Sequence, residues 1–265
     1  MHATPADALD VEAAIEHWHA HGYARLGPVL GAARLAELRD RADAIMRGEV
    51  VVPGLFFQHD ARTGRYEDLE HGKGWEGPSL AYRKIEKLER DDVFRRLVDE
   101  PRYAPLVRAA YPGAAGATVY RAILMSKPAG GGTPLPWHQD GGQFWGLDRE
   151  PVCQLWTALD DAPEDGGCVE VLPGSHLGGL ATPLGGVVPE ALVAAAEADA
   201  RAIKLPARAG EALLLHNHVW HRSARSLTGA QRRAFSVCYL DAATRCRRRK
   251  GPPRTFFSAF ADAPF

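Results

Sequence analysis

The chain has 265 residues, of which 46% are hydrophobic and 25% are charged, and its formal net charge is −1. This length suffices for one large domain or two small ones with a substantial core. The near-neutral charge gives no electrostatic reason to expect nucleic acid or an anionic membrane as a partner. The composition therefore favours a globular protein that acts on a small dissolved molecule.

The cysteines and the N-terminal sequence indicate where such a protein works. None of the four cysteines forms a CxxC pair; they are Cys153, Cys168, Cys238 and Cys246. A chain of this size does not depend on disulfides, so a reduced setting fits best. The N-terminus has early acidic residues and no apolar run typical of a signal peptide. No segment approaches the roughly 20 apolar residues that cross a bilayer. We therefore expect a cytoplasmic protein.

The N-terminal part of the chain is predicted to be mainly helical. Apolar residues at helical spacing mark two amphipathic helices, over residues 5–21 and 31–48, and residues 23–30 form a short strand between them. Residues 51–79 are rich in Gly, His and aromatic residues without a clear period, which predicts a long loop that covers a site. Residues 81–88 are predicted to form a strand.

The character of the sequence changes after a further helical stretch. Residues 91–113 predict two short helices that are broken at Pro101. One more helix is predicted at 189–202, with Pro189 suited to its first turn. Six strand-like runs punctuated by Gly, Pro and Asp follow the helical part, at residues 117–128, 150–161, 167–176, 200–210, 211–221 and 233–241. Helices first and strands later indicate an α+β fold in which a β-sandwich or barrel carries the site.

The segment WHQDGGQFW, residues 137–145, contains the first candidate for chemistry. On a strand, His138 and Asp140 project from the same face because side chains alternate. An imidazole and a carboxylate on one face make two ligands of a metal site. A third neutral ligand would complete the 2-His-1-carboxylate triad, which leaves positions on Fe(II) open for oxygen chemistry. Taken alone, the triplet is equally compatible with a hydrogen-bonded polar turn.

The segment 216–237 contains candidates for the third ligand and for a cation. His216, His218 and His221 lie at the end of an apolar run, where they either bind metal or cap the strand towards solvent. Arg232 follows His221 by eleven residues, at the start of another strand. A guanidinium binds a carboxylate through two hydrogen bonds, and a dicarboxylate co-substrate such as 2-oxoglutarate requires such a partner. The alternative is a surface charge beside Arg233.

These features together resemble the phytanoyl-CoA dioxygenase-like (PhyH) family of Fe(II)/2-oxoglutarate-dependent oxygenases. The segments that carry the resemblance are HWHAHGYARLGPVL, WHQDGGQFWGL, LWTALDDAPEDGGCVEVLPGSH, GEALLLHNHVWHRSA and QRRAFSVCYLD. The resemblance therefore covers most of the chain. It implies a double-stranded β-helix, a jelly-roll or cupin-like core with flanking N-terminal helices. We accordingly expect one oxygenase domain over residues 1–265, with a helical part at about 1–110, a jelly-roll core at about 117–242 and a basic tail at 243–265.

The resemblance also implies roles for individual residues. His138, Asp140 and His221 would bind Fe(II). His221 is chosen over His216 and His218 because the family's distal histidine stands just before a small or polar residue and Ser. Arg232 would hold the distal carboxylate of 2-oxoglutarate, and Ser223 would approach the same co-substrate.

Two further positions are candidates for the co-substrate site. Trp156 matches an aromatic position near the co-substrate, although it reads equally well as a core residue. Lys84 or its neighbour Arg83 would reach the co-substrate or the substrate, and strand alternation sends only one of them inward; we name Lys84 as the candidate.

The presence of Asp140 bears on the expected reaction. Halogenating relatives lack this carboxylate, so the resemblance favours hydroxylation of an unactivated C–H bond with O₂, releasing succinate and CO₂. Desaturation, epimerisation or cyclisation at the same metal site, and a non-redox cupin-like metal-binding domain, remain alternatives.

The substrate is expected to be a small molecule such as a secondary-metabolite intermediate or an acyl-CoA. The basic segment 245–254 either attracts an anionic substrate or is simply solvated. Sequence does not indicate the oligomeric state.

Overall fold

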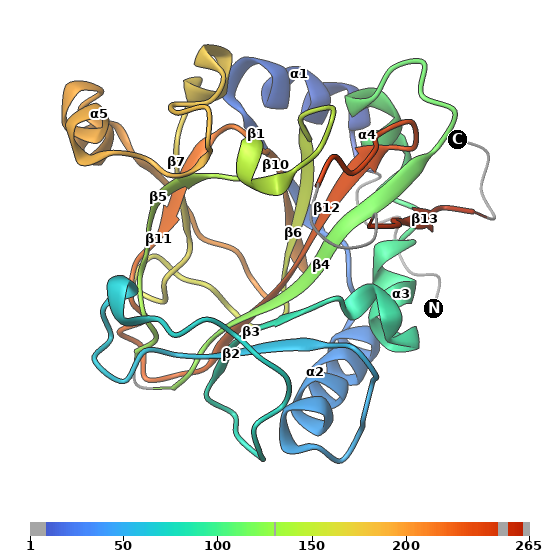
Figure 1. Ribbon diagram of the computed structural model, residues 1–265, viewed down its shortest axis with the longest axis vertical. Helices are drawn as coiled ribbons and strands as arrows, with labels where there is room; N and C mark the ends of the chain where they lie inside the picture. The colour runs from blue at the N-terminus through green and yellow to red at the C-terminus, as the bar shows by residue number, and fades with distance from the viewer. Residues whose placement is uncertain (1–8, 130, 249–253, 262–265) are drawn as a thin grey trace, which may run out of the picture.

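The computed structural model describes residues 9–129, 131–248 and 254–261. In these ranges two antiparallel sheets face each other, and the N-terminal helices lie beyond the larger sheet (Figure 1). The larger sheet has the strand order β1-β10-β6-β12-β4-β3-β2, and β13 pairs with β4. The smaller sheet has the order β8-β5-β11-β7-β9. Consecutive strands alternate between the sheets from β4 to β7 and again from β9 to β12, as in a jelly roll.

The strands have the following bounds. Those of the larger sheet are β1 Tyr23–Pro28, β2 Phe56–His59, β3 Tyr82–Glu86, β4 Ala117–Lys127, β6 Cys153–Ala158, β10 Glu211–His216, β12 Arg232–Asp241 and β13 Phe257–Ala259. Those of the smaller sheet are β5 Leu135–Gln139, β7 Val169–Leu172, β8 Gly186–Val187, β9 Ile203–Leu205 and β11 Trp220–Ser223.

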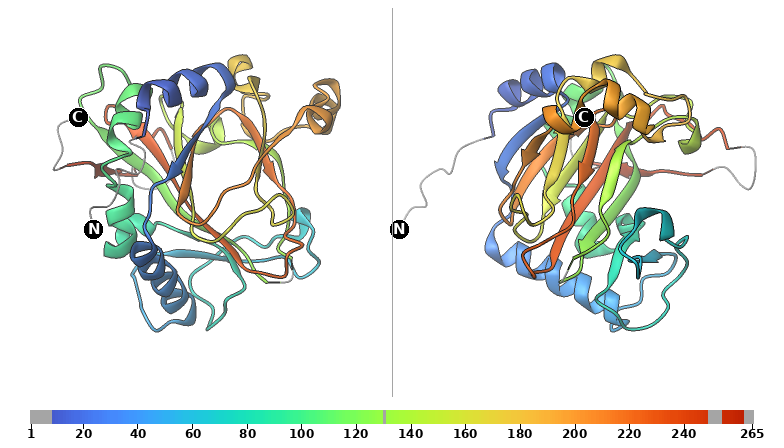
Figure 2. Two further views of the ribbon diagram at one scale, coloured as in Figure 1. Left: turned by 180° about the vertical axis from the view of Figure 1, so that it is seen from behind. Right: turned by 90° about the vertical axis from the view of Figure 1, so that its left-hand side faces the viewer.

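The helices are short and mostly N-terminal. The α-helices are α1 Val11–His21, α2 Ala32–Arg47, α3 Asp92–Val98, α4 Ala104–Ala110, α5 Glu190–Ala195 and α6 Ala198–Arg201. The 3₁₀ helices are η1 Tyr66–Asp68, η2 Leu88–Arg90, η3 Gln143–Trp145 and η4 Ser175–Gly178. Figure 2 shows α5 and α6 (orange) at one end of the smaller sheet, on the side that faces the viewer in the right-hand panel. No helix among the described residues is long and apolar enough to cross a membrane.

Alternation along β12 divides its residues between two environments. Phe235, Val237 and Tyr239 belong to the large hydrophobic core beneath the N-terminal helices. Ala234 packs instead in the smaller core between the two sheets. The even-numbered residues of β12 therefore face the space between the sheets, where the candidate site lies, because successive side chains point to opposite faces.

Truncating a side chain on the helix-facing side of β12 is expected to destabilise the whole fold. Phe235 has no exposed surface, and its ring lies 5.1 Å from that of Phe94 in α3. Phe235→Ala should lower the free energy of unfolding by about 3–5 kcal/mol, because it removes the ring and leaves a cavity. Chemical denaturation measures this change. Phe144→Ala, at a phenylalanine that is 75% exposed, is the matched control and should change stability by less than about 0.5 kcal/mol.

Several predicted elements are confirmed. The helix predicted at 31–48 is α2, which ends at Gly48 with a positive φ of 76°. The stretch 91–113 contains α3 and α4 on either side of Pro101. The helix predicted at 5–21 is present as α1 from Val11, and the first residues of that prediction, 5–8, lie outside the described residues.

Two predicted elements are wrong in detail. The loop at 51–79 contains β2, which adds an edge strand to the larger sheet by pairing with β3, a long-range contact that its own four residues do not indicate. The helix at 189–202 is interrupted between α5 and α6. Glu197 stands there with a φ of 50°, a left-handed conformation that a continuous helix does not accept.

The run 211–221, predicted as one strand, is two strands in different sheets. β10 ends at His216, and a turn closed by the hydrogen bond from Val219 N to His216 O (2.9 Å) leads to β11 in the smaller sheet. The run contains no Gly or Pro between the two strands, so its sequence lacks the residues that most strongly mark a turn at the crossing. The strands β5, β8 and β13 were not among the six predicted runs. The division into helical part, core and tail stays a prediction.

Candidate metal centre

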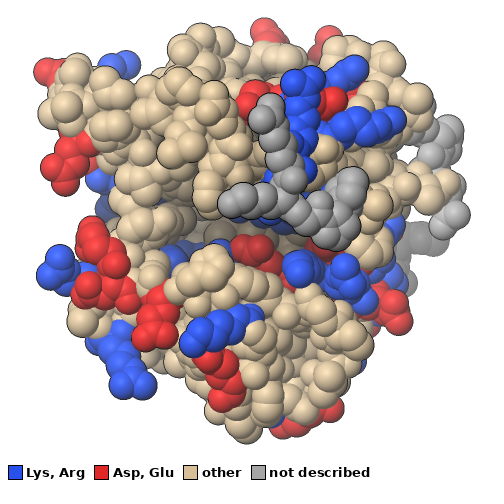
Figure 3. All heavy atoms as spheres, in the orientation of Figure 1, with Lys and Arg blue, Asp and Glu red and all other residues tan. Residues whose placement is uncertain are grey.

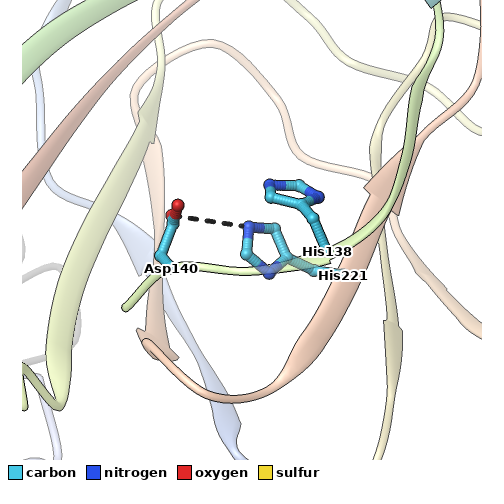
Figure 4. A group of neighbouring side chains, drawn as sticks. All are labelled: His138, Asp140 and His221. Carbon is cyan, nitrogen blue, oxygen red and sulfur yellow. Dashed lines mark ion pairs between the residues drawn. The ribbon is translucent and has the colours of Figure 1, made fainter. Parts of the chain in front are cut away.

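Two neighbouring strands of the smaller sheet bring His138, Asp140 and His221 together (Figure 4). His138 on β5 and His221 on β11 are direct cross-strand partners, and their ring centroids are 3.9 Å apart. Asp140 follows the end of β5 and returns to the same face two residues after His138. One potential ligand atom from each residue lies within 4.8 Å of the other two. His138 and Asp140 therefore share a face, as the HxD spacing predicted, and His221 joins them from β11.

Both imidazoles are held in the form that binds a metal ion. His138 Nδ1 is 2.9 Å from Pro136 O, and His221 Nδ1 is 2.9 Å from Val219 O. A carbonyl oxygen only accepts, so each Nδ1 donates and each Nε2 keeps its lone pair. Burial, with repulsion from His221, lowers the pKa of His138 to about 3. This ligand consequently stays neutral at physiological pH.

Asp140 supplies the negative charge of the cluster. Its Oδ1 accepts a hydrogen bond from Arg121 Nη2 (2.6 Å), and its Oδ2 lies 3.7 Å from His221 Nε2. Burial by itself would raise the pKa of Asp140, but the Arg121 guanidinium and the two imidazoles outweigh burial and hold this pKa well below its usual range. Two imidazoles and one carboxylate match the donor set of the facial triad that binds Fe(II).

The other two candidate histidines do not join the cluster. His216 Nδ1 accepts from the backbone N–H of His218 (3.0 Å), and His218 Nε2 lies 3.4 Å from Glu150 Oε2. Among the described residues, the group of His138, Asp140 and His221 is the one that brings three possible ligands together. The turn between β10 and β11 explains the selection, because it carries His221 alone into the smaller sheet.

The cluster opens into a cavity of about 490 Å³ between the two sheets. Strands β4, β6 and β12 supply its second wall, and the β2–β3 region and the segment 143–145 lie along it. The space-filling view shows this face of the molecule hollowed across its middle, with basic and acidic side chains along the hollow (Figure 3). The triad thus borders a space that is large enough for small molecules.

Arg232 lies on the cavity side of β12 and is almost fully buried. Its Nη2 donates to Gly167 O (2.9 Å), but its buried Nε has no hydrogen-bond partner among the described residues. Burial lowers the pKa of Arg232 to about 10, which still leaves a cation at neutral pH. A buried guanidinium with an unused donor indicates a site for an anionic acceptor. The alternative of a surface charge is wrong.

The neighbouring Arg233 differs in surroundings from Arg232. It points away from the cavity, and its guanidinium pairs with Asp160 (2.8 Å) and Asp43 (2.6 Å). Alternation on one strand therefore separates an arginine that borders the cavity from one that ties β12 to α2 and to the segment after β6.

The remaining predicted residues all border the cavity. Trp156 borders the cavity and also belongs to the core between the sheets, and its position near the co-substrate stays a prediction. Ser223 ends β11 near His221. The expectation that only one of Arg83 and Lys84 faces inward is wrong, because both lie along the cavity between the buried Tyr82 and Ile85. Arg83 approaches Asp60 (3.8 Å), and Lys84 pairs with Glu86 (2.7 Å).

Polar residues that the sequence pattern did not indicate also border the cavity, among them Arg121, Lys127, Gln154 and Ser236. Lys127 is the cross-strand partner of Arg232 and donates to Thr133 O (3.0 Å). Burial, reinforced by Arg232, lowers the pKa of Lys127 to about 6. Two basic side chains therefore share one buried corner of the cavity. The period-2 spacing of residues 121, 123, 125 and 127 is the signal that could have identified this wall.

The basic segment 245–254 lies beside the cavity wall where it is described. Arg247 N donates to Gly146 O (2.7 Å), and Arg245 N donates to Asp148 Oδ1 (2.7 Å). Residues 249–253 of this segment lie outside the described residues. Its interaction with an anionic substrate stays a prediction.

Comparison with known proteins places this site in a family. The sequence model of the phytanoyl-CoA dioxygenase (PhyH) family matches residues 18–234. The chain belongs to the PhyH family. This family consists of Fe(II)- and 2-oxoglutarate-dependent oxygenases, and the His138–Asp140–His221 cluster offers the set of ligands that such an iron site uses.

Curated PhyH relatives are similar at a moderate level. Phytanoyl-CoA dioxygenase domain-containing protein 1 of Bos taurus is 29% identical over 161 residues, covering 58% of this chain and 54% of that protein. The chain thus matches about half the length of this relative. L-proline trans-4-hydroxylase of Streptomyces griseoviridis is 28% identical over 177 residues, covering 58% of this chain and 65% of that protein.

Solved structures confirm the double-stranded β-helix fold. The structure of EctD from S. alaskensis with 2-oxoglutarate and 5-hydroxyectoine superposes with a TM-score of 0.71 at 18% identity, covering 96% of this chain and 84% of that chain. The epimerase SnoN in complex with Fe³⁺, alpha ketoglutarate and nogalamycin RO gives a TM-score of 0.69 at 19% identity, covering 96% of this chain and 95% of that chain.

Proposed function

We propose that this PhyH-family protein hydroxylates an unactivated C–H bond of a small molecule, with conversion of 2-oxoglutarate and O₂ to succinate and CO₂. The observation that carries the proposal is the complete triad, Asp140 included, at the wall of a cavity between the sheets. An intact carboxylate ligand favours oxygenation over halogenation in this class of enzyme. Hydroxylase relatives such as the proline hydroxylase support the same reaction type.

Each residue of the site has a proposed role. His138, Asp140 and His221 hold the iron through two Nε2 atoms and a carboxylate oxygen. Arg232 receives the distal carboxylate of 2-oxoglutarate through its free donor, and Ser223 lies beside the same subsite. The oxidant would be O₂, which the iron would activate with 2-oxoglutarate as the co-substrate that is oxidised to succinate and CO₂. The protein contributes the fixed ligand set and a cavity that limits access of water.

Trp156 and Lys84 are proposed to complete the co-substrate side of the cavity. Trp156 is 2% exposed and offers a rigid wall between the sheets. Lys84 lies along the cavity on β3, and its charge is paired with Glu86. It would therefore act on the co-substrate as a hydrogen-bond donor and not as an unpaired positive charge. Both roles remain proposals.

The rest of the cavity suggests the chemistry of the substrate. Apolar parts of the cavity wall are formed by Ile123, Met125 and Val187. Polar groups are supplied by Gln154 and Ser236. A small molecule with an apolar framework and a few hydrogen-bonding groups fits such a surface. We further propose action in the cytoplasm, since all four cysteines are free thiols.

Epimerisation is the second candidate reaction, because SnoN, an epimerase, has a similar fold. The two reactions differ in product. A hydroxylase adds one oxygen atom from O₂, whereas an epimerase returns a product of unchanged mass. A non-redox metal-binding domain is less well supported, because such a domain binds no dicarboxylate co-substrate. It would leave the buried Nε of Arg232, which has no hydrogen-bond partner among the described residues, without a role.

The proposal is tested by succinate formation from the purified protein in the presence of a panel of candidate substrates. We expect succinate release that requires Fe(II), 2-oxoglutarate and O₂ together, and a product that gains one ¹⁸O atom from ¹⁸O₂. Unchanged product mass with substrate-dependent succinate release would favour epimerisation. Absence of any Fe(II)-dependent 2-oxoglutarate turnover, with or without substrate, would contradict the oxygenase assignment of this site.

A further inference from the structure

Arg121 links the metal-ligand cluster to a stack of aromatic rings. Its guanidinium carbon lies 4.4 Å from the ring centroid of Trp145, and Trp145 stacks on Tyr120 at 4.3 Å with an interplanar angle of 9°. The guanidinium of Arg254 lies 4.4 Å from the centre of the Tyr120 ring. A ring has only two faces, so these groups form a column in the order Arg254, Tyr120, Trp145 and Arg121. The column ends at Asp140, through the hydrogen bond to its Oδ1.

The column makes Arg121 a fixed donor. Trp145 and Tyr120 are 6% and 5% exposed and belong to one hydrophobic cluster, so the rings that support the guanidinium have little freedom. A guanidinium that stacks on an aromatic face keeps its donors in one plane. The hydrogen bond to Asp140 Oδ1 at 2.6 Å is short, as expected for a pair of charged groups.

The charge of Arg121 is already balanced within the protein. Burial by itself would lower the pKa of Arg121, but Asp140 and Glu86 together raise it above the usual value. Two carboxylates therefore compensate this cation. An anionic substrate group would have to compete with Asp140 for it, so the role of Arg121 lies with the metal ligand.

We propose that Arg121, held against Trp145, is a positioning residue for Asp140. Its hydrogen bond occupies Oδ1 and leaves Oδ2, on the side of His221, as the oxygen offered to the metal. A carboxylate with both oxygens free binds a divalent ion through one or both of them. Fixing one oxygen keeps the remaining metal positions open for the co-substrate and orients the ligand in advance. This inference rests on the proposed iron site and deepens it.

The test compares divalent-metal binding by three variants and the wild type. Arg121→Met removes the hydrogen-bond donors but keeps a side chain of similar volume. It should raise the Kd for Mn(II) by about 10–100-fold, as measured by titration followed by electron paramagnetic resonance. Arg121→Lys keeps the positive charge but has a shorter, non-planar donor group. It should show a smaller loss of Mn(II) affinity than Arg121→Met. Trp145→Leu removes the ring on which Arg121 stacks. It should weaken Mn(II) binding, because the Arg121 guanidinium is then free to move away from Asp140. Unfolding curves of the metal-free proteins check that each variant is folded.

Arg222→Met is the matched control. Arg222 is also ion-paired, to Glu170 at 2.9 Å, and also lies over a tryptophan, at 4.6 Å from Trp137, but its side-chain ion pairs among the described residues are with Glu170 and Asp199 and with none of the three ligands. Its Mn(II) affinity should equal that of the wild type. Arg222→Met losing as much affinity as Arg121→Met would overturn a specific role for Arg121.

The outcomes separate this inference from the proposed function. Wild-type affinity in Arg121→Met, or a raised substrate KM with unchanged metal affinity, would overturn the positioning role while the oxygenase stands. A wild-type protein that binds no divalent metal would overturn both. If Arg121→Met does not fold, the affinity of Arg121→Lys decides: a value equal to wild type rejects the inference, and a weaker value supports it.

Discussion

Replacing His221 by alanine is expected to reduce Fe(II)-dependent succinate formation by on the order of 10³-fold or more. The substitution removes one of only three protein ligands, and a metal ion in such a site contributes several kcal/mol to the reaction. His221 also closes the geometry of the cluster, since it is the direct cross-strand partner of His138. The measurement is succinate release at saturating Fe(II) and 2-oxoglutarate, with Mn(II) affinity determined in parallel.

His218→Ala is the control for this prediction. His218 lies three residues earlier, on the turn that precedes β11, and its imidazole, of which 12% is exposed, lies 3.4 Å from Glu150 Oε2. Its removal should leave succinate formation within about twofold of the wild type, because His218 is not one of the three residues of the cluster. Equal activities of His221→Ala and the wild type would remove His221 from the metal site. Loss of activity in both variants would point to disruption of the turn.

Replacing Arg232 by methionine is expected to raise the KM for 2-oxoglutarate by about 100-fold or more. A buried guanidinium that pairs with a carboxylate contributes about 2–5 kcal/mol to binding, and its free Nε donor has no other partner in the described structure. Lys127 in the same corner is not expected to replace it, since its pKa of about 6 leaves it largely neutral at pH 7. The measurement is the dependence of succinate formation on 2-oxoglutarate concentration.

Arg233→Met is the control that distinguishes an effect on co-substrate binding from an effect on the stability of the fold. Arg233 follows on the same strand but pairs with Asp160 and Asp43 outside the cavity. Its loss should lower the free energy of unfolding by about 1–3 kcal/mol, because it leaves partly buried carboxylates without their donor, and should leave the KM for 2-oxoglutarate unchanged. A KM that rises equally in both variants would show that strand integrity, not the guanidinium of Arg232, determines co-substrate binding.

The two predictions address different parts of one reaction. In the proposed roles, His221 binds the metal ion, so its loss should affect turnover at any co-substrate concentration. Arg232 binds the co-substrate in the same proposal, so high 2-oxoglutarate should partly restore turnover in Arg232→Met. A protein that used its metal without redox chemistry would show neither pattern.

Local sequence determined the elements whose pattern is complete within a few residues. The amphipathic spacing and terminal glycine of α2 needed no distant partner, and the HxD spacing placed His138 and Asp140 on one face. The same holds for the alternation on β12, which puts Arg232 and Arg233 on opposite sides. Such features follow from helix and strand geometry, which depends on residues close in the chain.

Tertiary structure alone decided which residues meet. The run 211–221 reads as one strand, and only the crossing into the second sheet puts His221 beside His138 while His216 stays behind. The same pairing of distant strands brings Arg121 of β4 against Asp140 and Lys127 against Arg232. Strand partners are selected by burial across the whole sandwich, and no single segment encodes that balance. The sequence by itself therefore indicated the candidate metal ligands, and the packing of the two sheets determined which of them meet and which residues surround them.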